Sequence, residues 1–381
     1  MIPLGLQAVE AQLQAEVAAL AGARYVREDG HPGIVRWGAQ PGSVFLADQK
    51  LPVTVPRVRD RVHGREVPLP SYQALQTPRA HDAGLYRRVL AGIATREYRA
   101  AAEAVPAAMG LSRTSVSRRF IRASAQALEQ LQTRALGGRE WIALVLDGKT
   151  FSGEQLVLAL GITRTGEKVL LGLVQTATEN RAVCASFLRG LGERGFPLDG
   201  ALLVVIDGAK GLRAAVRDTL PHAVVQRCQW HKRENVVRYL AKPQQSLWRR
   251  KLQAAYAQPT LTQAHAALTK LRRELQLLNA SAAASLDEGL DETLTLHRLG
   301  VIRELGTSFK TTNLIESVNA RVEARRRRVT RWRTSDQKQR WCAAALLAHE
   351  GQFRRIKGHE HLRLLDRALR ATLPTSRITA A

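Results

Sequence analysis

The stretch WIALVLDGKTFSGEQLVLALGITRTGEKVLLGLVQ, residues 141–175, decides the fold. It contains three apolar runs, at 141–149, 154–162 and 167–175, which are separated by short polar segments. Apolar runs of this length between turn-forming residues are typical of buried strands, and short connections favour antiparallel neighbours. The stretch therefore predicts a sheet of three consecutive antiparallel strands.

Downstream of this sheet the pattern alternates between helix and strand. A helix is expected over 180–196, a strand over 200–208, a second helix over 209–220 and a last strand over 222–230. Asn180 is a favourable N-cap for the first of these helices. Three antiparallel strands followed by helix, strand, helix and strand is the element order of the RNase H-like α/β fold. We therefore predict an α/β RNase H-like catalytic core.

The predicted core is interrupted by an all-helical insertion. Residues 236–305 are helical by pattern and rich in Ala, Leu and Arg, whereas the core itself would comprise 136–235 and 306–350. Beyond the core, 351–381 is expected to form a C-terminal helical tail.

The N-terminal part has a different composition. Within 1–77, a helix is expected at 5–21, followed by a small β-rich element in which Gly and Pro separate short strand-like runs such as SVFL and LPVTVPRVRD. The helix carries Glu10 and Glu16 and lacks a basic start, so it is predicted to be amphipathic and not a signal peptide. The β-rich element has its own basic residues and is expected to contact DNA.

Residues 78–135 have the pattern of a helix-turn-helix. A helix of small residues would end near Met109, Gly110 would form the turn, and Ser112 would cap the second helix. The second helix carries Arg and short polar side chains near its start, where a recognition helix reaches base edges and phosphates. The candidate DNA-binding residues are Arg113, Ser115, Arg118 and Arg119.

The charge of the chain points to a polyanionic partner. Lys and Arg number 58 against 33 Asp and Glu, which gives a net charge of +25. Such an excess favours nucleic acid as a partner, although a drift of the composition toward Arg is an alternative. Three scattered cysteines do not support a disulfide framework, and no apolar run approaches the ~18 residues of a membrane span. We therefore expect a cytoplasmic, nucleoid-associated protein without membrane contact.

Two predicted strands end in the same way. LVLDGK places Asp147, and VVIDGAK places Asp207, where an apolar strand gives way to Gly. One alternative is that each Asp-Gly pair is only a turn. If the strands are neighbours, both side chains can converge on one face, where a cation would offset their mutual repulsion. Mg²⁺ binds such carboxylates together with phosphate oxygens, so a magnesium site is predicted.

A third acid, Glu316, lies in the segment SFKTTNLIESVNARV. Because Asn313 precedes it by three residues, the pattern is also that of a helix capping box. Residues 313–341, however, hold nine Lys or Arg against three acids, a local charge of +6. An acid beside a phosphate-binding helix suits metal-assisted phosphoryl chemistry, so Glu316 is a candidate third ligand. A rival acid, Glu179, lies at a helix start, where the dipole favours it and predicts a structural role.

Several motifs together resemble a known family. DGKTFSGEQLVLALGITRTGEKVLLGLVQ, VVIDGAKGLRAAV, RCQWHKRENVVRYL, FKTTNLIESVNARV and RRVTRWRTSDQKQRW are similar in order and spacing to Mutator-type bacterial insertion-sequence transposases, over roughly residues 40–360. Asp207 lies 60 residues after Asp147, and Glu316 lies 109 residues after Asp207. The longer gap accommodates the helical insertion that these enzymes carry.

The resemblance implies a DDE transposase that binds the terminal inverted repeats of an insertion sequence, cleaves DNA and transfers the strands to a target. It implies a catalytic triad of Asp147, Asp207 and Glu316 that holds two Mg²⁺ or Mn²⁺ ions in each active site. Double-stranded DNA, as terminal repeats and as target, would be the partner, and a homodimer on paired ends is expected. A catalytically inactive or domesticated DNA-binding regulator and a structure-selective nuclease are the alternative functions.

The resemblance extends to a Cys-x-x-His motif, Cys228 to His231. It implies that His231 contacts the scissile phosphate and that Trp230 stacks on an unpaired base, with half of a zinc site and a buried Trp as the alternatives. The family also has the Arg331-Trp332 pair, for which DNA contact and burial are both open. Basic residues near the triad in sequence are candidate phosphate contacts or else solvated surface: Lys149, Lys210, Arg213 and Lys310.

Overall fold

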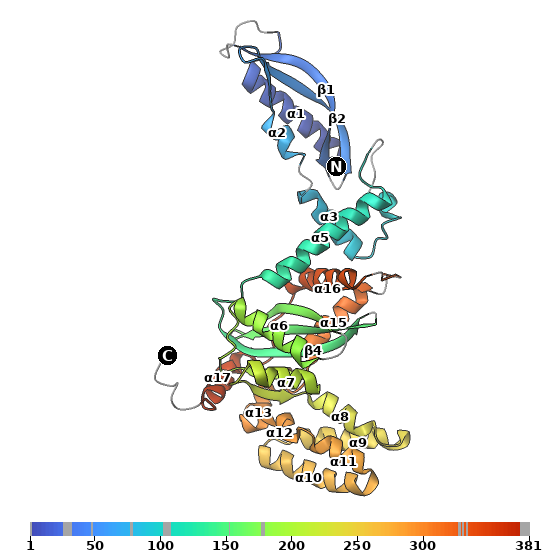
Figure 1. Ribbon diagram of the computed structural model, residues 1–381, viewed down its shortest axis with the longest axis vertical. Helices are drawn as coiled ribbons and strands as arrows, with labels where there is room; N and C mark the ends of the chain where they lie inside the picture. Colours follow the sequence, from blue (N-terminus) through green and yellow to red (C-terminus); the bar gives the residue numbers. More distant parts are fainter. Residues whose placement is uncertain are drawn as a thin grey trace. The chain divides into compact units, whose positions relative to one another are not determined.

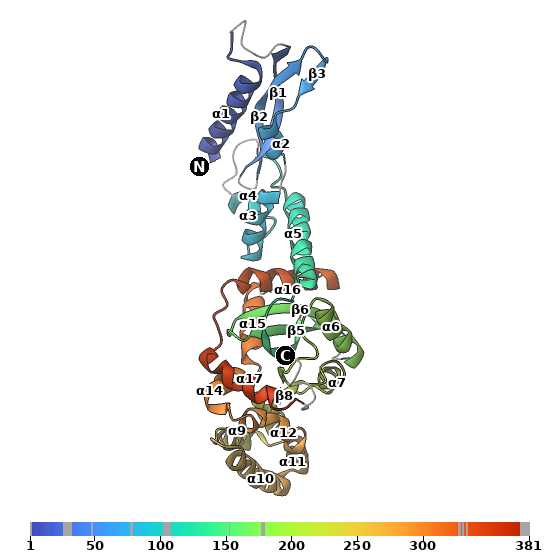
Figure 2. The same ribbon diagram turned by 90° about the vertical axis from the view of Figure 1, so that its left-hand side faces the viewer.

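The computed structural model divides the chain into two compact units, Met1–Gln126 and Ala127–Ala381 (Figures 1 and 2). Each unit has a hydrophobic core of its own. Within the described part of the chain, no helix is both long and apolar enough to cross a membrane. The residues that the structure describes are 2–25, 33–46, 49–76, 79–101, 108–151, 153–176, 180–326, 329, 331–332 and 334–373.

In the first unit, one helix packs on a small antiparallel sheet. Helix α1 (Ile2–Ala21) lies against strands β1 (Ile34–Leu46) and β2 (Gln49–Asp60), and β3 (Arg65–Val67) pairs with β2 (Figure 2). The predicted helix and β-rich element are therefore confirmed. The core between them consists of Val9, Leu13, Val17, Val44, Val53, Val55, Val58 and Leu69.

Strand β1 runs through the residues that were expected to interrupt it. Gly and Pro at 38–42 predicted a break before the run SVFL, but β1 pairs with β2 over its whole length. A register shift between Arg36 and Ala39 accommodates Gly38, whose φ of +80° is a conformation that Gly adopts without strain. The expected break is therefore a bulge within one long strand.

Short helices α2 (Pro70–Ala74), α3 (Arg79–Leu90) and α4 (Tyr98–Ala101) precede the long α5 (Arg113–Thr133). The predicted cap of α5 is confirmed, because the Oγ of Ser112 accepts a hydrogen bond at 3.3 Å from the backbone N–H three residues on.

Met109, near which the preceding helix was expected to end, is not itself helical. Met109 forms an isolated β-bridge with Lys50, through two backbone hydrogen bonds of 3.0 and 2.9 Å. Its backbone is therefore paired with the sheet rather than with a helical turn. Gly110 follows with a φ of +83°, so the chain does reverse where a turn was expected. Residues 102–107 lie outside the described residues.

The second unit is built around a five-stranded mixed sheet, consistent with an RNase H-like core. All five predicted strands form, and their order is β6-β5-β4-β7-β8, with antiparallel pairing from β4 to β6 and parallel pairing of β4 with β7 and of β7 with β8. The first strand along the chain is therefore the central one. Their bounds are β4 (Trp141–Phe151), β5 (Glu154–Thr163), β6 (Lys168–Thr176), β7 (Leu203–Ile206) and β8 (Val224–Arg227).

Helices cover both faces of this sheet (Figure 2). On one face, α6 (Arg181–Glu193) and α7 (Lys210–Thr219) bury an apolar core that includes Leu144 and Leu146 of β4. Because side chains alternate along a strand, Asp147 belongs to the other face. On that face lie α15 (Asn313–Arg326) and α16 (Ser335–Glu350), which contact β4 and β6 respectively.

The chain between β8 and α15, which contains the expected insertion 236–305, is helical. Its helices enclose a separate apolar core that includes Trp248, Leu252, Leu268 and Leu275. A 3₁₀ turn (His359–His361) and α17 (Leu362–Arg370) follow α16, as expected for a helical tail. The insertion comprises α8 (Gln229–Val237), α9 (Lys242–Tyr256), α10 (Leu261–Leu278), α11 (Ala280–Asp287), α12 (Leu290–Thr293), α13 (Thr295–Arg298) and α14 (Ile302–Phe309).

Candidate active site

Asp147 lies in the middle of the central strand and not at its end. β4 continues to Phe151, and Gly148 pairs with Val157 of β5, so the Asp-Gly pair is not a turn here. The expected strand end was therefore wrong, because pairing with β5 keeps the following polar residues extended. The Asp147 side chain is 6% exposed and accepts a hydrogen bond at 3.2 Å from Nδ2 of Asn319 on α15.

Asp207 lies directly after β7, beside Asp147. The parallel register of β4 and β7 pairs Val145 with Val205, so each Asp stands two residues beyond a paired Val. Here the strand does end, and Gly208 has a φ of +101°. One carboxylate oxygen of Asp207 accepts the Ala209 N–H at 2.9 Å. The two Asp residues therefore meet at neighbouring strands, as predicted.

Glu316 is brought to the same region by the first turn of α15. Its Oε1 accepts a hydrogen bond at 2.8 Å from the Thr312 hydroxyl and lies 3.9 Å from Nε2 of His231. Because α15 starts at Asn313 and the Thr312 carbonyl accepts the Glu316 N–H, Thr312 occupies the cap position. The capping box with Asn313 as cap was therefore the wrong alternative.

His231 connects the three acids electrostatically. It lies in the first turn of α8, and its backbone N–H donates to the Cys228 sulfur at 3.5 Å. Burial of the ring acts to lower its pKa, but Cys228 and the negative charges of Asp147 and Asp207 outweigh burial and raise the pKa of His231 to about 9. The imidazole is therefore a cation at neutral pH, beside all three carboxylates.

The acids suit a hard divalent cation. Asp147, Asp207 and Glu316 supply only oxygen donors, the ligands that such a cation prefers. After Cys228, the charges of Asp147 and Asp207 contribute to the raised pKa of His231. Within the described ranges and in this conformation, no group of three or more His, Cys, Asp or Glu side chains is arranged so that it could by itself hold a metal ion. Mg²⁺ does not need such a group, because it retains waters and takes ligands from substrate phosphates.

The aromatic and basic residues predicted near the acids occupy different environments. Trp230 is 45% exposed and makes an edge-on contact with the His231 ring at 4.8 Å, so a buried Trp was the wrong alternative. Trp332 is partly buried, with its ring 6.5 Å from that of Trp341. Among the basic candidates, the exposed ones are Lys210, Lys310 and Arg331, whereas Lys149 is half-buried.

The helix-turn-helix candidates also divide by exposure. Arg113 and Arg118 are exposed on α5, and Ser115 is half-buried. Arg119 is only 7% exposed, so in this conformation it faces the core of its own unit. Glu179, the rival acid, lies outside the described residues.

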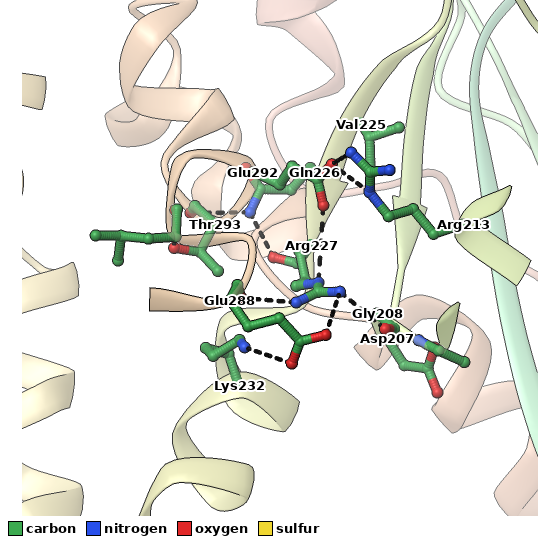
Figure 3. A network of polar contacts seen from close by, with 12 residues as sticks. Asp207, Gly208, Arg213, Val225, Gln226, Arg227, Lys232, Glu288, Glu292 and Thr293 are labelled. Atoms are coloured by element: carbon green, nitrogen blue, oxygen red, sulfur yellow. Dashed lines mark hydrogen bonds and ion pairs between the residues drawn. The ribbon is translucent and has the colours of Figure 1, made fainter. Parts of the chain in front are cut away.

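A buried arginine behind Asp207 was not anticipated from the sequence. Arg227, the last residue of β8, has a side chain 4% exposed, and it donates to the carbonyls of Gly208 at 2.9 Å and Glu288 at 2.7 Å (Figure 3). A Cβ on Gly208 would lie 2.4 Å from Arg227 Nε. The guanidinium thus fills the space beside Gly208 and ties the loop after Asp207 to the helical insertion.

Acids of the insertion surround this guanidinium (Figure 3). Glu292 lies 3.7 Å from Arg227 and accepts a hydrogen bond at 2.6 Å from Arg213, a predicted phosphate contact that is therefore paired within the protein. Glu288 lies 3.8 Å from both Arg227 and Lys232. Three cations and two acids thus form one network behind Asp207.

Comparison with known proteins identifies the family of the chain. A family model described as "Transposase, Mutator family" matches residues 5–353. The transposase for insertion sequence element IS256 in transposon Tn4001 of Staphylococcus aureus is 27% identical over 289 residues, which cover 72% of this chain and 70% of that protein. The transposase for insertion sequence element ISRM5 of Rhizobium meliloti is 26% identical over 327 residues, 84% of this chain and 79% of that protein.

Proposed function

The chain belongs to the Mutator family of transposases and catalyses the transposition of an insertion sequence, and we propose that Asp147, Asp207 and Glu316 are its catalytic carboxylates. The observation that carries this proposal is geometric: Asp147 and Asp207 follow the paired Val145 and Val205 of neighbouring parallel strands, and α15, the helix of Glu316, contacts Asp147 through Asn319 at 3.2 Å. Glu316 also lies 3.9 Å from His231. The five-stranded sheet, with Asp147 on its central strand, would then be the RNase H-like core of the enzyme.

The three carboxylates would hold the divalent metal ions, Mg²⁺ or Mn²⁺. When bound, such ions polarise the scissile phosphate and lower the pKa of an attacking water or 3′-hydroxyl. Asn319 orients Asp147 through its amide, and Thr312 orients Glu316 through its hydroxyl. These neighbours reduce the freedom of both carboxylates before substrate binds.

His231 and Trp230 face the substrate side of the same site in this proposal. The protonated imidazole would contact the scissile phosphate, where a positive charge stabilises the charge that develops on the phosphoryl oxygens. The half-exposed indole beside it would stack on an unpaired base at the cleavage point.

The substrates proposed are the terminal inverted repeats of the element and a target duplex, bound by a homodimer on paired ends. The exposed Arg113 and Arg118 of α5 would read the repeats, and the net charge of +25 favours an extended interface with phosphates. Lys210, Lys310 and Arg331 are exposed and would contribute to that interface.

The decisive experiment combines carboxylate variants with labelled terminal-repeat DNA. Asp147→Asn, Asp207→Asn and Glu316→Gln should each reduce 3′-end cleavage and strand transfer by roughly 10²–10³-fold with Mg²⁺ or Mn²⁺. DNA binding should be retained, because none of these acids attracts phosphate. Glu193→Gln, an exposed acid of α6, is the matched control and should keep full activity. Cleavage at the normal rate in any of the three variants would remove that residue from the triad.

A further inference from the structure

A second basic surface lies at the far edge of the catalytic sheet. A groove of about 370 Å³ opens beside β6, which is the edge strand and is separated from β4 by β5. Its walls come from β6, from the segment between α5 and β4, and from the end of α16. The residues that line it are Arg134, Arg139, Glu167, Lys168, Val169, Glu350, Phe353 and Arg355.

One of the two acids in this groove is already neutralised. The Glu350 carboxylate accepts two hydrogen bonds of 2.8 Å from the Arg134 guanidinium and a third, also of 2.8 Å, from the Leu170 N–H. Its charge and its lone pairs are therefore largely satisfied within the protein. Glu167 is the second acid and is exposed.

The remaining cations of the groove have no such partner. Among the residues that the structure describes, none forms a hydrogen bond or an ion pair with the side chains of Arg139, Lys168 or Arg355. Lys168 is nevertheless half-buried, so its ammonium is partly withdrawn from water without a counter-charge. This arrangement is costly for the free protein and suits a site that is completed by an anion.

Two titratable groups of this region are affected by burial and by the positive charge of Arg321. Burial lowers the pKa of Lys168 on β6, and the charge of Arg321 lowers it further. Burial also lowers the pKa of His349 on α16, and the charges of Arg325 and Arg321 add to that effect against a hydrogen bond with Gln352. Groups on two different elements thus both experience an excess of positive charge.

We propose that this groove binds the phosphodiester backbone of duplex DNA, as a binding surface separate from the carboxylate site. Arg139 and Arg355 offer planar guanidinium donors that match phosphate oxygens, and Lys168, which also lines the groove, adds a point charge. Side chains that recognise only phosphates do not read sequence. The groove therefore holds terminal-repeat DNA and unrelated duplex equally well.

The test compares two double variants with the same change in charge. Arg139→Glu/Arg355→Glu alters the groove, whereas Arg189→Glu/Arg303→Glu alters exposed arginines on α6 and α14 of the same unit. Binding of terminal-repeat and unrelated duplexes is measured by fluorescence anisotropy over a salt series without divalent metal. The groove variant should bind both duplexes at least about tenfold more weakly than the control variant. Its log–log salt slope should also fall by about 0.9 for each phosphate that the protein no longer neutralises.

Lys168→Gln provides a second, milder probe in case the double variant folds poorly. It should weaken binding of both duplexes alike and reduce the salt slope by about 0.9, the value for one phosphate, with an unchanged melting temperature. If the groove variants bind no more weakly than the control, or lose affinity for only one duplex, the proposal is overturned. The measurement is independent of the carboxylate assignment, because Asp147→Asn should bind as the unaltered chain does even if the triad is misassigned.

Discussion

The two Asp-Gly pairs of this protein have the same sequence and different structures. Asp147-Gly148 lies inside a regular strand that continues to Phe151, whereas Asp207-Gly208 ends its strand with Gly208 at a φ of +101°. The difference arises because β5 pairs with β4 beyond Asp147, while β7 is paired only up to Ile206. The dipeptide permits a turn, and the neighbouring strand decides whether one forms.

The two carboxylates are consequently held in place by different means. Asp147 is fixed by its strand and by the Asn319 amide at 3.2 Å. Asp207 belongs to a loop, and that loop is held by Arg227, whose guanidinium bonds to the Gly208 carbonyl. Sheet pairing therefore fixes the position of Asp147, and a buried network of charged side chains fixes the position of Asp207. A substitution on one side should leave the other carboxylate in place.

The largest effect is expected from removing the charge that holds the Asp207 loop. Arg227→Met would remove the buried donor to the Gly208 and Glu288 carbonyls, and each buried acceptor left without a partner costs about 1–3 kcal/mol in free energy of unfolding. Denaturant unfolding should show this decrease. Arg272→Met, which breaks an exposed pair with Asp287 in the same insertion, is the control and should cost less than about 1 kcal/mol. Equal costs for the two variants would show that Arg227 does not anchor the loop.

The next prediction compares alanine substitutions at the two glycines, Gly208 and Gly148. Gly208→Ala would impose a φ of +101° on Ala and place its Cβ 2.4 Å from Arg227 Nε, so a strain of about 1–3 kcal/mol and a displaced Asp207 are expected. The rate at which terminal-repeat DNA is cleaved should fall by a larger factor than the fraction of folded protein does. Gly148→Ala, in a regular strand, should cost less in thermal unfolding. A Gly208→Ala enzyme with normal cleavage would mean that the loop conformation is not needed.

The sequence predicted the elements of the catalytic sheet because apolar runs report strands directly. It placed Asp147 and Asp207 correctly beside each other, but it ended β4 too early, since Gly148 and the polar residues after it look like a turn. It also gave no sign that Met109, expected near the end of a helix, pairs with Lys50. In both cases the deciding interaction comes from another strand, and no local pattern reveals it.

The supporting residues of the site could not be found from the sequence for the same reason. Asn319 is 172 residues from the Asp147 that it contacts, and Arg227 is 61 residues from Glu288. Neither residue belongs to a recognisable motif. The sequence therefore does not show which polar residue of α15 contacts Asp147, or which polar residue at the end of β8 contacts the insertion. Glu316 was identified by the resemblance and by its basic surroundings, and its hydrogen bond to Thr312 became visible only in the structure.

A smaller effect is expected on the Asp147 side. Asn319→Leu keeps the volume of the side chain but removes the donor to a carboxylate that is only 6% exposed. A roughly 10–100-fold loss of metal-dependent cleavage is expected, with a higher Mn²⁺ concentration needed for half-maximal rate. Asn313→Leu, exposed on the same helix, should leave that concentration unchanged. An unaltered metal requirement in Asn319→Leu would show that the strand alone positions Asp147.

The last effect is a change of stability with pH and concerns the three cations in the network behind Asp207. Burial, followed by the charge of Arg227, lowers the pKa of Lys232 from 10.5 to about 8, and its side chain is 2% exposed. Between pH 8 and 10.5 the unfolded chain therefore binds more protons than the folded one, so the free energy of unfolding should rise with pH across this window. The rise is at most about 1.4 kcal/mol per pH unit.

Lys232→Met should remove this rise, and the exposed Lys242→Met should not. The difference between the variant and the unaltered chain, from denaturant unfolding at about pH 7.5 to 10.5, isolates the contribution of Lys232 from other titrating groups. The network behind Asp207 would then be under charge strain that sheet pairing does not impose on Asp147. If the free energy of unfolding changed with pH in the same way in Lys232→Met and in the unaltered chain, Glu288 and Glu292 would already balance the three cations. The surroundings of Asp207 would then carry no more uncompensated charge than those of Asp147.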